Sequence, residues 1–318
     1  ATLLSPVAFA AESQLAERIL DNAGVRGGLI VHVGCGDGKL TAALHASQAY
    51  LVHGLDADPA NVEKAREHIR SLGLYGDVSV SHLEGGRLPY ADDIVNLVVS
   101  RNLGDVSMDE VMRVLCPNGV ALIRSGDTLI RKIKPRPDDI GEWTHYLQDA
   151  SNNAVAADTK VAAPRRLKWA CGPLWTRDHE FNSSLCAMVS GGGRLFYVFD
   201  EGLPGVTDAS LPEKWTLIAR DAFNGTLLWK LPLADWGTHR WKKRALRSVP
   251  MTIPRRIVAQ GDKLFVTLGY DSPISVLDAA TGMVLTTYEE TAGTEEIRCI
   301  EAVSYTHLRA HETSLHLV

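Results

Sequence analysis

The chain has 318 residues, of which 45% are hydrophobic and 22% charged, and its formal net charge is −5. This composition excludes a disordered chain and is sufficient for two buried cores. The weakly acidic balance provides no basic field for nucleic acid, and no run approaches the roughly 20 apolar residues of a membrane span. The five cysteines form no CxxC pair, so neither a metal site nor a disulfide framework is predicted.

Both ends of the chain carry unusual segments. Residues 1–10 are apolar and end in Ala8-Phe9-Ala10, a pattern typical of a signal-peptidase site. The charged start of such a signal is missing, so two interpretations stay open. A signal remnant implies an exported protein, and an ordinary apolar segment implies a cytoplasmic one. Residues 304–318 break the preceding pattern, and we interpret them as a non-native tail, with the natural protein continuing beyond about residue 303.

Between Ala11 and Arg124, strand-like and helical patterns alternate. Strands are predicted at Leu29–Val33, Leu51–Leu55, Val78–His82, Ile94–Ser100 and Gly119–Arg124, and helices around Leu15–Leu20, after the loop through Leu44, and at Pro59–Leu72 and Met108–Leu115. Such alternation predicts a Rossmann-like α/β domain, a doubly wound parallel sheet that spans residues 11–128.

A linker and a β-rich half follow. Charge and proline accumulate at Arg131–Asp139, where neither helix nor strand is expected to continue, so residues 129–165 are predicted to form a linker and lead-in. Residues 166–303 contain short strand-like runs between turn residues, which predict an all-β unit. Within it the turn Asp221-Ala222-x-x-Gly225 recurs 57 residues later as Asp278-Ala279-x-x-Gly282, which indicates an internal repeat.

The loop Gly34-Cys35-Gly36-Asp37-Gly38 follows the first predicted strand and precedes a helix. Alternate glycines allow a tight turn and bring backbone N–H groups close to a ligand at a helix N-terminus. A dinucleotide fingerprint would need glycine at the position of Lys39, so the spacing favours an adenosyl amino acid and disfavours a nucleotide-dependent oxidoreductase.

Asp56 ends the second predicted strand, twenty positions after Gly36. An acidic side chain there is expected to accept hydrogen bonds from both ribose hydroxyls. A surface turn is the competing interpretation, but Asp58 suits the helix cap better because Pro59 follows it.

Residues from about Ala11 to Arg124 resemble the class I S-adenosylmethionine-dependent methyltransferases. The resemblance rests on the VGCGDGKL loop, Gly54-Leu55-Asp56, Leu88–Asp92 and Arg113–Gly119. It implies methyl transfer from S-adenosylmethionine, with the cofactor bound by Gly34, Cys35, Gly36, Asp37 and Gly38, by Asp56 at the ribose, and by Leu83 and Glu84 at the adenine. Glu84-Gly85 departs from the usual Asp-Ala pair, and a solvated turn is the alternative there.

Catalytic residues are harder to assign. Methyl transfer is an in-line displacement that depends mainly on positioning, so it demands no particular acid or base. Asn102, after the fourth predicted strand, is the candidate, although it lacks the Asn-Pro-Pro-aromatic motif and loop hydrogen bonding competes as its role. The usual final hairpin of the sheet is not evident, so a degenerate, binding-only domain stays open.

The repeats between Arg166 and Glu290 resemble the pyrroloquinoline-quinone-type β-propellers, which implies a partial propeller. We expect no quinone in this chain, because the calcium site and stacking aromatics of a complete ring are not found. Trp143–Tyr146 is interpreted as a packing lead-in. The leading hypothesis is a methyltransferase-like protein whose propeller recognises a methyl acceptor or a protein partner. The alternative is a non-enzymatic, extracytoplasmic propeller scaffold with a degenerate methyltransferase domain.

Overall fold

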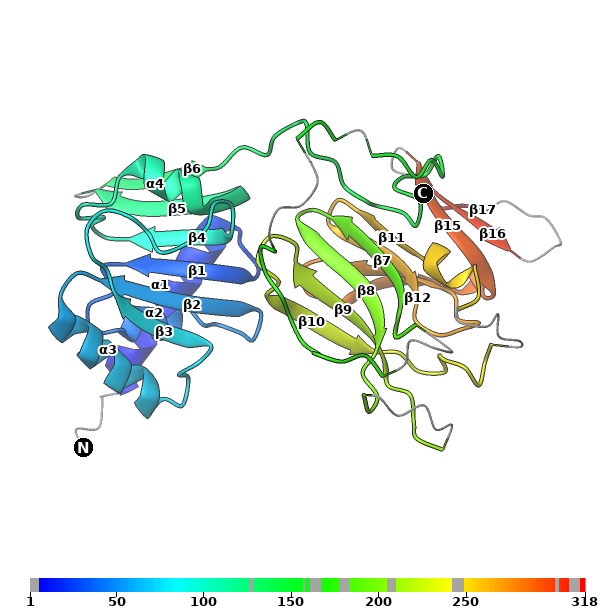
Figure 1. Ribbon diagram of the computed structural model, residues 1–318, viewed down its shortest axis with the longest axis horizontal. Helices are drawn as coiled ribbons and strands as arrows, with labels where there is room; N and C mark the ends of the chain where they lie inside the picture. Colours follow the sequence, from blue (N-terminus) through cyan, green and yellow to red (C-terminus); the bar gives the residue numbers. More distant parts are fainter. Residues whose placement is uncertain are drawn as a thin grey trace. The chain divides into compact units, whose positions relative to one another are not determined.

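The computed structural model describes residues 6–125, 128–156, 158–160, 167–177, 183–204, 210–241, 249–300, 303–308 and 315–317. The chain divides into two compact units, Ala1–Pro137 with Phe223–Leu228, and Asp138–Ala222 with Trp229–Val318 (Figure 1). Each unit has its own sheets and is described by itself. Residues 1–5 of the predicted signal remnant lie outside the described part of the chain.

The first unit is a doubly wound α/β sheet. Its helices are α1 (Pro6–Ala23), α2 (Lys39–Ala43), α3 (Pro59–Ser71) and α4 (Met108–Val114), and its strands are β1 (Gly28–Val33), β2 (Tyr50–Asp56), β3 (Val78–His82), β4 (Val95–Ser100), β5 (Leu115–Ser125) and β6 (Thr128–Ile133). The sheet order is β3-β2-β1-β4-β5-β6, in which only β6 is antiparallel to its neighbour. The predicted α/β class is confirmed.

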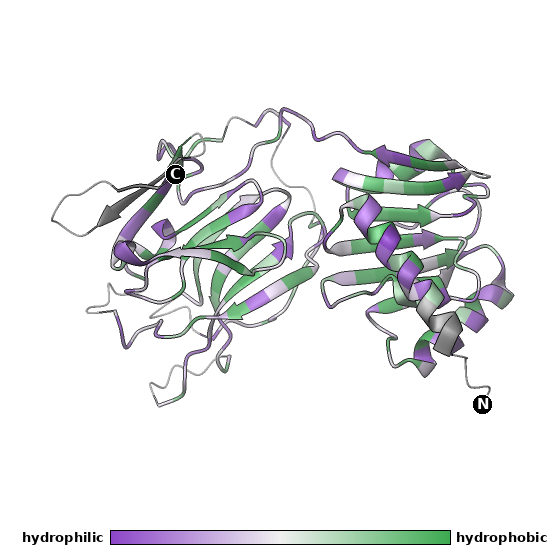
Figure 2. Cartoon of the chain, turned by 180° about the vertical axis from the view of Figure 1, so that it is seen from behind, coloured by the Kyte–Doolittle hydropathy of each residue, from purple (hydrophilic) through white to green (hydrophobic). Residues whose placement is uncertain are grey.

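Two hydrophobic cores cover the two faces of this sheet. Helices α1, α2 and α3 pack on one face, where Ile30 and Leu97 are fully buried, and Figure 2 shows α1 crossing that face. Helix α4 packs on the opposite face against Val31 and Val98. Successive residues of each strand therefore serve different cores, as the period of two requires. No helix among the described residues is both long and apolar enough to cross a membrane.

The cap of α3 follows its sequence. Asp58 is the N-cap, its side chain accepts a hydrogen bond from the Ala60 N–H at 2.9 Å, and Pro59 occupies the first helical position. The prediction that Asp58 rather than Asp56 caps this helix is confirmed. Asp56 is thereby left for another role.

Strand β6 corrects the expectation that no strand continues through residues 131–139. Each of residues 128–133 pairs with a residue between positions 120 and 125 of β5, so the sheet extends past the predicted end of the domain at residue 128. The strand was missed because its side chains are exposed and basic residues lie among them, which is how edge strands avoid further pairing. Arg131 donates to the Asn22 and Ala23 carbonyls at 3.0 and 3.3 Å, and so places a cation at the C-terminus of α1.

The second unit is all-β among its described residues, as predicted. Its strands are β7 (Leu185–Gly191), β8 (Arg194–Asp200), β9 (Trp215–Asp221), β10 (Leu227–Pro232), β11 (Ile257–Gln260), β12 (Lys263–Thr267), β13 (Ile274–Asp278), β14 (Val284–Tyr288), β15 (Thr294–Ile300), β16 (Val303–Leu308) and β17 (Leu315–Leu317), with short 3-10 helices at Ile253–Arg255 and Glu289–Thr291. Strands β7 to β10 and β11 to β14 form two four-stranded sheets in sequential order. The described residues do not close into a ring, and no propeller is confirmed. Strands β16 and β17 fall largely within residues 304–318, whose non-native origin stays a prediction.

Equivalent tryptophan contacts link the predicted repeats. The Trp229 indole N–H donates to the Ala279 carbonyl at 3.1 Å, which lies in the turn of the second repeat. Trp169 donates in the same way to Ala222, at 3.1 Å, in the turn of the first repeat. Because Ala222 and Ala279 occupy matching positions, Trp169 stands where a preceding repeat would end.

The lead-in segment packs against three of these sheets. Ser190 in β7 donates to the Trp143 carbonyl at 2.7 Å, and Ala259 in β11 donates to the Thr144 carbonyl at 3.0 Å. The third contact is to β15, where the Cys299 N–H donates to Nε2 of the buried His145 at 3.1 Å. Burial lowers the pKa of His145, which keeps the ring neutral and able to accept this bond.

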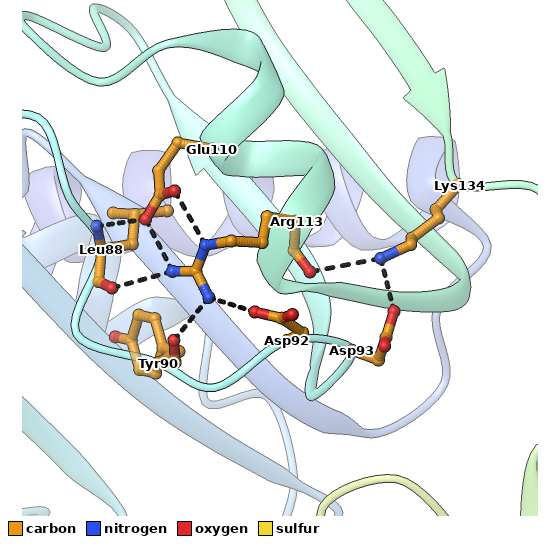
Figure 3. A network of polar contacts seen from close by, with 7 residues as sticks. All are labelled: Leu88, Tyr90, Asp92, Asp93, Glu110, Arg113 and Lys134. Atoms are coloured by element: carbon orange, nitrogen blue, oxygen red, sulfur yellow. Dashed lines mark hydrogen bonds and ion pairs between the residues drawn. The ribbon is translucent and has the colours of Figure 1, made fainter.

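A network around Arg113 fastens the loop after β3 to α4 (Figure 3). Its guanidinium donates to both oxygens of Glu110, at 2.6 and 2.8 Å, and to Asp92 at 2.6 Å. It also donates to the carbonyls of Leu88 and Tyr90, at 3.2 and 2.9 Å. The Arg113 side chain thus holds Leu88–Asp92, which is one of the segments on which the resemblance to methyltransferases rests.

We expect Arg113→Met to lower the free energy of unfolding of the α/β unit by about 2 kcal/mol, because it removes the hydrogen bonds of the guanidinium to Glu110, Asp92 and the carbonyls of Leu88 and Tyr90. The Arg113 hydrogen bond lowers the pKa of Glu110. The stabilisation is therefore fully present above about pH 4.3, the ordinary glutamate value, and is lost as the pH falls through the lower folded value. Denaturant unfolding from pH 7 to 3 measures it. Asp92→Asn, at a largely exposed side chain, is the control and should cost under about 1 kcal/mol.

Candidate functional site

The glycine loop closes over the end of β2. The N–H groups of Gly34 and Cys35 both donate to the Leu55 carbonyl, at 2.8 and 3.1 Å. The glycines Gly34, Gly36 and Gly38 have φ values of 73°, 57° and 79°, in the left-handed region that favours glycine. This explains the alternate spacing of glycine in physical terms.

Each glycine of the loop has a different spatial role. A Cβ on Gly38 would lie 2.8 Å from the Ala65 Cβ, so the loop needs glycine there to pack against α3. A Cβ on Gly36 would meet nothing within 4 Å, so that side of the loop faces open space. Cys35 is buried, and burial followed by the charge of Asp56 raises the pKa of its thiol to about 12, which makes it a packing residue. The Asp37 carboxylate pairs with Lys39 at 2.5 Å.

Asp56 joins this loop to the start of α3. One carboxylate oxygen accepts the Gly36 N–H at 2.8 Å. The other accepts the Asp58 N–H at 2.9 Å and the Asn61 amide at 3.2 Å. The side chain is 7% exposed, and these donors compensate for its burial.

The predicted adenine residues differ in placement. Leu83 is buried, and its N–H donates to the Asp56 carbonyl at 2.9 Å, so it lies beside Asp56, and its place at the adenine stays a prediction. The Glu84 side chain is 88% exposed and lies 3.6 Å from His82. This exposure agrees with the alternative interpretation of Glu84 as a solvated turn.

Asn102 lies near the loop but its side chain is engaged elsewhere. Its carbonyl oxygen is 3.3 Å from the position of a Cβ on Gly34, whereas its side-chain oxygen accepts the Gly104 N–H at 3.0 Å. Ser100, two residues earlier, donates to the Val33 carbonyl at 2.9 Å. The contact to Gly104 is the loop hydrogen bond that competed with a catalytic role.

A cavity of about 470 Å³ lies next to the loop, on the α1 face of the sheet. Its walls come from α1, from the carboxyl ends of β4 and β5, from Leu129 in β6 and from Leu40, two residues after Gly38. Its volume is within the range of small-molecule sites. Sequence reasoning missed this cavity, because its lining comes from segments far apart in the chain.

His32 lies in β1 on the same face and is buried, and its Nδ1 is 2.9 Å from the Thr41 hydroxyl. Burial, and then the positive charge of Arg101, lower its pKa from 6.5 to about 4, against the opposing effect of Asp56. The ring is therefore neutral at pH 7 and acts as a hydrogen-bonding core residue.

Comparison with known proteins shows that part of the α/β unit matches a protein family. Residues 30–119 match the model of the methyltransferase domain family. This part of the α/β unit is similar to a methyltransferase domain. The match contains the glycine loop, Asp56, Leu83, Glu84 and Asn102. It does not extend into the β unit.

Among curated relatives, methyltransferase GfsG of Streptomyces halstedii is 34% identical over 125 residues, covering 36% of this chain and 44% of the relative. Ribosomal protein L11 methyltransferase of Clostridium botulinum is 29% identical over 137 residues, covering 41% and 42%. A structure of geranyl diphosphate C-methyltransferase from Streptomyces coelicolor A3(2), with S-adenosyl-L-homocysteine bound, is 22% identical with a TM-score of 0.33, covering 35% and 45%. The chain thus spans less than half the length of these curated relatives.

The residues of the methyltransferase domain fit the cofactor. A carboxylate has about four acceptor positions, and Asp56 uses three of them for Gly36, Asp58 and Asn61. One position remains for a ribose hydroxyl, and a second becomes available if Asn61 turns away. The open space at Gly36 admits a ligand against the loop backbone.

Two glycine variants should separate packing from ligand contact. Gly38→Ala should destabilise the methyltransferase domain by about 1 to 3 kcal/mol, because the added Cβ would lie too close to the Cβ of Ala65, which is fixed to the backbone of α3. Gly36→Ala should cost only the left-handed strain of about 1 kcal/mol, yet weaken S-adenosylmethionine binding because its Cβ enters the open space. Denaturant unfolding and calorimetric binding of both variants check this. Equal effects of the two variants on stability would contradict it.

The His32 imidazole should stay neutral down to about pH 5, which NMR titration of its ring resonances measures. Its lowered pKa means that the unfolded chain takes up a proton before the folded one, so stability falls as the pH falls from about 6.5 towards 4. We expect a loss of about 2 kcal/mol between pH 7 and 5. The His32→Asn control, which keeps reach to Thr41 without titrating, should lack this loss. Titration of His32 near pH 6.5 would be inconsistent with its burial.

Proposed function

We propose that the protein is an S-adenosylmethionine-dependent methyltransferase. The observation that carries this proposal is the closure of the glycine loop on Asp56, inside the segment that matches the methyltransferase domain. The alternative of a non-enzymatic scaffold is not favoured, because the loop and Asp56 keep the geometry that a bound cofactor needs.

In this proposal the loop and Asp56 fix the cofactor, and the adjoining cavity holds the methyl acceptor. S-adenosylmethionine supplies an activated methyl group on sulfur. The chain contributes position: Asp56 holds the ribose, the backbone at Gly36 lies against the ligand, and Leu40 joins the loop to the cavity. The cavity walls keep water away from the reacting atoms, and no proton transfer by Asn102 is needed.

We further propose that the β unit is part of a quinoprotein-like propeller that recognises the acceptor or a protein partner. The support is the recurrence of the Asp-Ala-x-x-Gly turn and the matching tryptophan contacts to Ala222 and Ala279. Four sequential antiparallel strands per sheet are the form of a propeller blade.

The test is calorimetric binding of S-adenosylmethionine and S-adenosylhomocysteine to the full chain. We expect micromolar affinity, weakened at least about tenfold, or 1.4 kcal/mol, by Asp56→Ala and by the near-isosteric Asp56→Asn. Asp58→Asn is the matched control, because asparagine also caps helices and should leave binding unchanged.

A folded wild-type chain that binds neither compound would refute the proposal. Equal losses in the Asp56 and Asp58 variants would also count against it, because they would show that the loss comes from the start of α3 rather than from the ribose contact. Circular dichroism of each variant confirms that it is folded before binding is compared.

A further inference from the structure

The cavity beside the glycine loop is lined by three arginines from three different elements. Arg18 comes from the middle of α1, Arg101 directly follows β4, and Arg124 comes from the end of β5. The chain separates Arg18 from Arg101 by 83 residues (101 − 18), so their convergence arises from the topology of the sheet.

No carboxylate lines this cavity within the described part of the chain. Arg18 donates from Nε to the Gln14 carbonyl at 3.3 Å, which leaves its terminal nitrogens available for another acceptor. Arg101 is exposed, and its positive charge helps to lower the pKa of His32, which is buried on the same face of the sheet. Arg18 and Arg101 thus bring two like charges to one hollow, and an anion between them would relieve their repulsion.

Apart from the arginines, Asn22 and Ser100, the lining is apolar. Leu15 and Ile19 come from α1, and Val99 and Leu122 come from the adjacent strands. Such a combination of an apolar wall with a few convergent charged groups selects a ligand with an apolar body and an anionic end. Guanidinium groups bind both carboxylate and phosphate in a two-pronged geometry.

We propose that this cavity binds small molecules with an apolar body and a carboxylate or phosphate group, and that these are the methyl acceptors of the protein. The second part rests on the proposed function. In this arrangement Arg18 and Arg101 hold the anionic group, and the apolar walls orient the body towards Leu40 and the glycine loop. A large protein acceptor is not required.

The experiment uses the full chain and four probes: three phenyl compounds of similar size, which are 3-phenylpropionate, its neutral amide 3-phenylpropionamide and phenyl phosphate, and inorganic phosphate as the anion without an apolar body. Saturation-transfer NMR and calorimetry measure their dissociation constants without S-adenosylmethionine. We expect the phenyl anions to bind at least tenfold more tightly than the amide and than inorganic phosphate. The ratio between 3-phenylpropionate and phenyl phosphate identifies the favoured anion.

Arg18→Gln combined with Arg101→Gln should weaken binding of the phenyl anions at least tenfold and leave the amide unchanged. Arg26→Gln is the matched control, because Arg26 is exposed and does not line the cavity, so it removes a charge without touching the site. Arg101→Lys should give an intermediate affinity, since it keeps the charge and loses the planar fork.

Equal binding of amide and anions, or equal losses in the cavity variant and the Arg26 control, would overturn the proposal. A separate titration with S-adenosylmethionine distinguishes it from the proposed function. Anion binding without cofactor binding would keep the anion site and remove its role in methyl transfer. Cofactor binding without anion preference would keep the methyltransferase proposal and remove this one.

Discussion

The Asp56 carboxylate is the contact on which the geometry of the site depends. It is buried, so it must be matched by donors, and those donors come from the glycine loop and from the first turn of α3. The loop can approach so closely only because Gly34, Gly36 and Gly38 adopt left-handed backbone conformations. The parallel pairing of β1 with β2 brings the two strand ends together, and the carboxylate then fixes the distance between them.

The two faces of the sheet have separate tasks. The face under α4 is held by the Arg113 network, which consists of hydrogen bonds inside the fold. The face under α1 contains neutral His32 and the cavity, with arginines at its rim. A positive rim and a desolvated histidine are compatible because the same positive charge that would attract an anionic ligand disfavours protonation of the ring. Polar structure on one face therefore stabilises the domain, and on the other it is available to a ligand.

The sequence predicted most of the sheet because β1, β4 and the second half of β5 are nearly continuous apolar runs, and such runs indicate buried parallel strands. It predicted the loop and Asp56 because their residues are adjacent or lie at a fixed spacing. It missed β6, which is exposed and basic. The cavity arginines could not be predicted, because their convergence is a property of sheet order and no local pattern marks it. The sequence predicted a turn at Cys116–Gly119, before the fifth strand. In the structure β5 already begins at Leu115, and its pairing with β4 continues past this turn with a shift in register.

In the β unit, long-range hydrogen bonds rather than a shared core pattern explain how one repeat meets the next. The indole N–H of Trp169 and that of Trp229 each bind an alanine carbonyl in the following turn. Thr286 stands 57 positions after Trp229, at the equivalent place, and a threonine cannot extend to a neighbouring turn as an indole does. The third sheet is linked differently, because β15 reaches the lead-in through the Cys299 N–H and His145, while β7 and β11 bind the adjacent backbone of Trp143 and Thr144. The lead-in thus holds the first strands of all three sheets, and the tryptophans join only those sheets that carry the repeated turn.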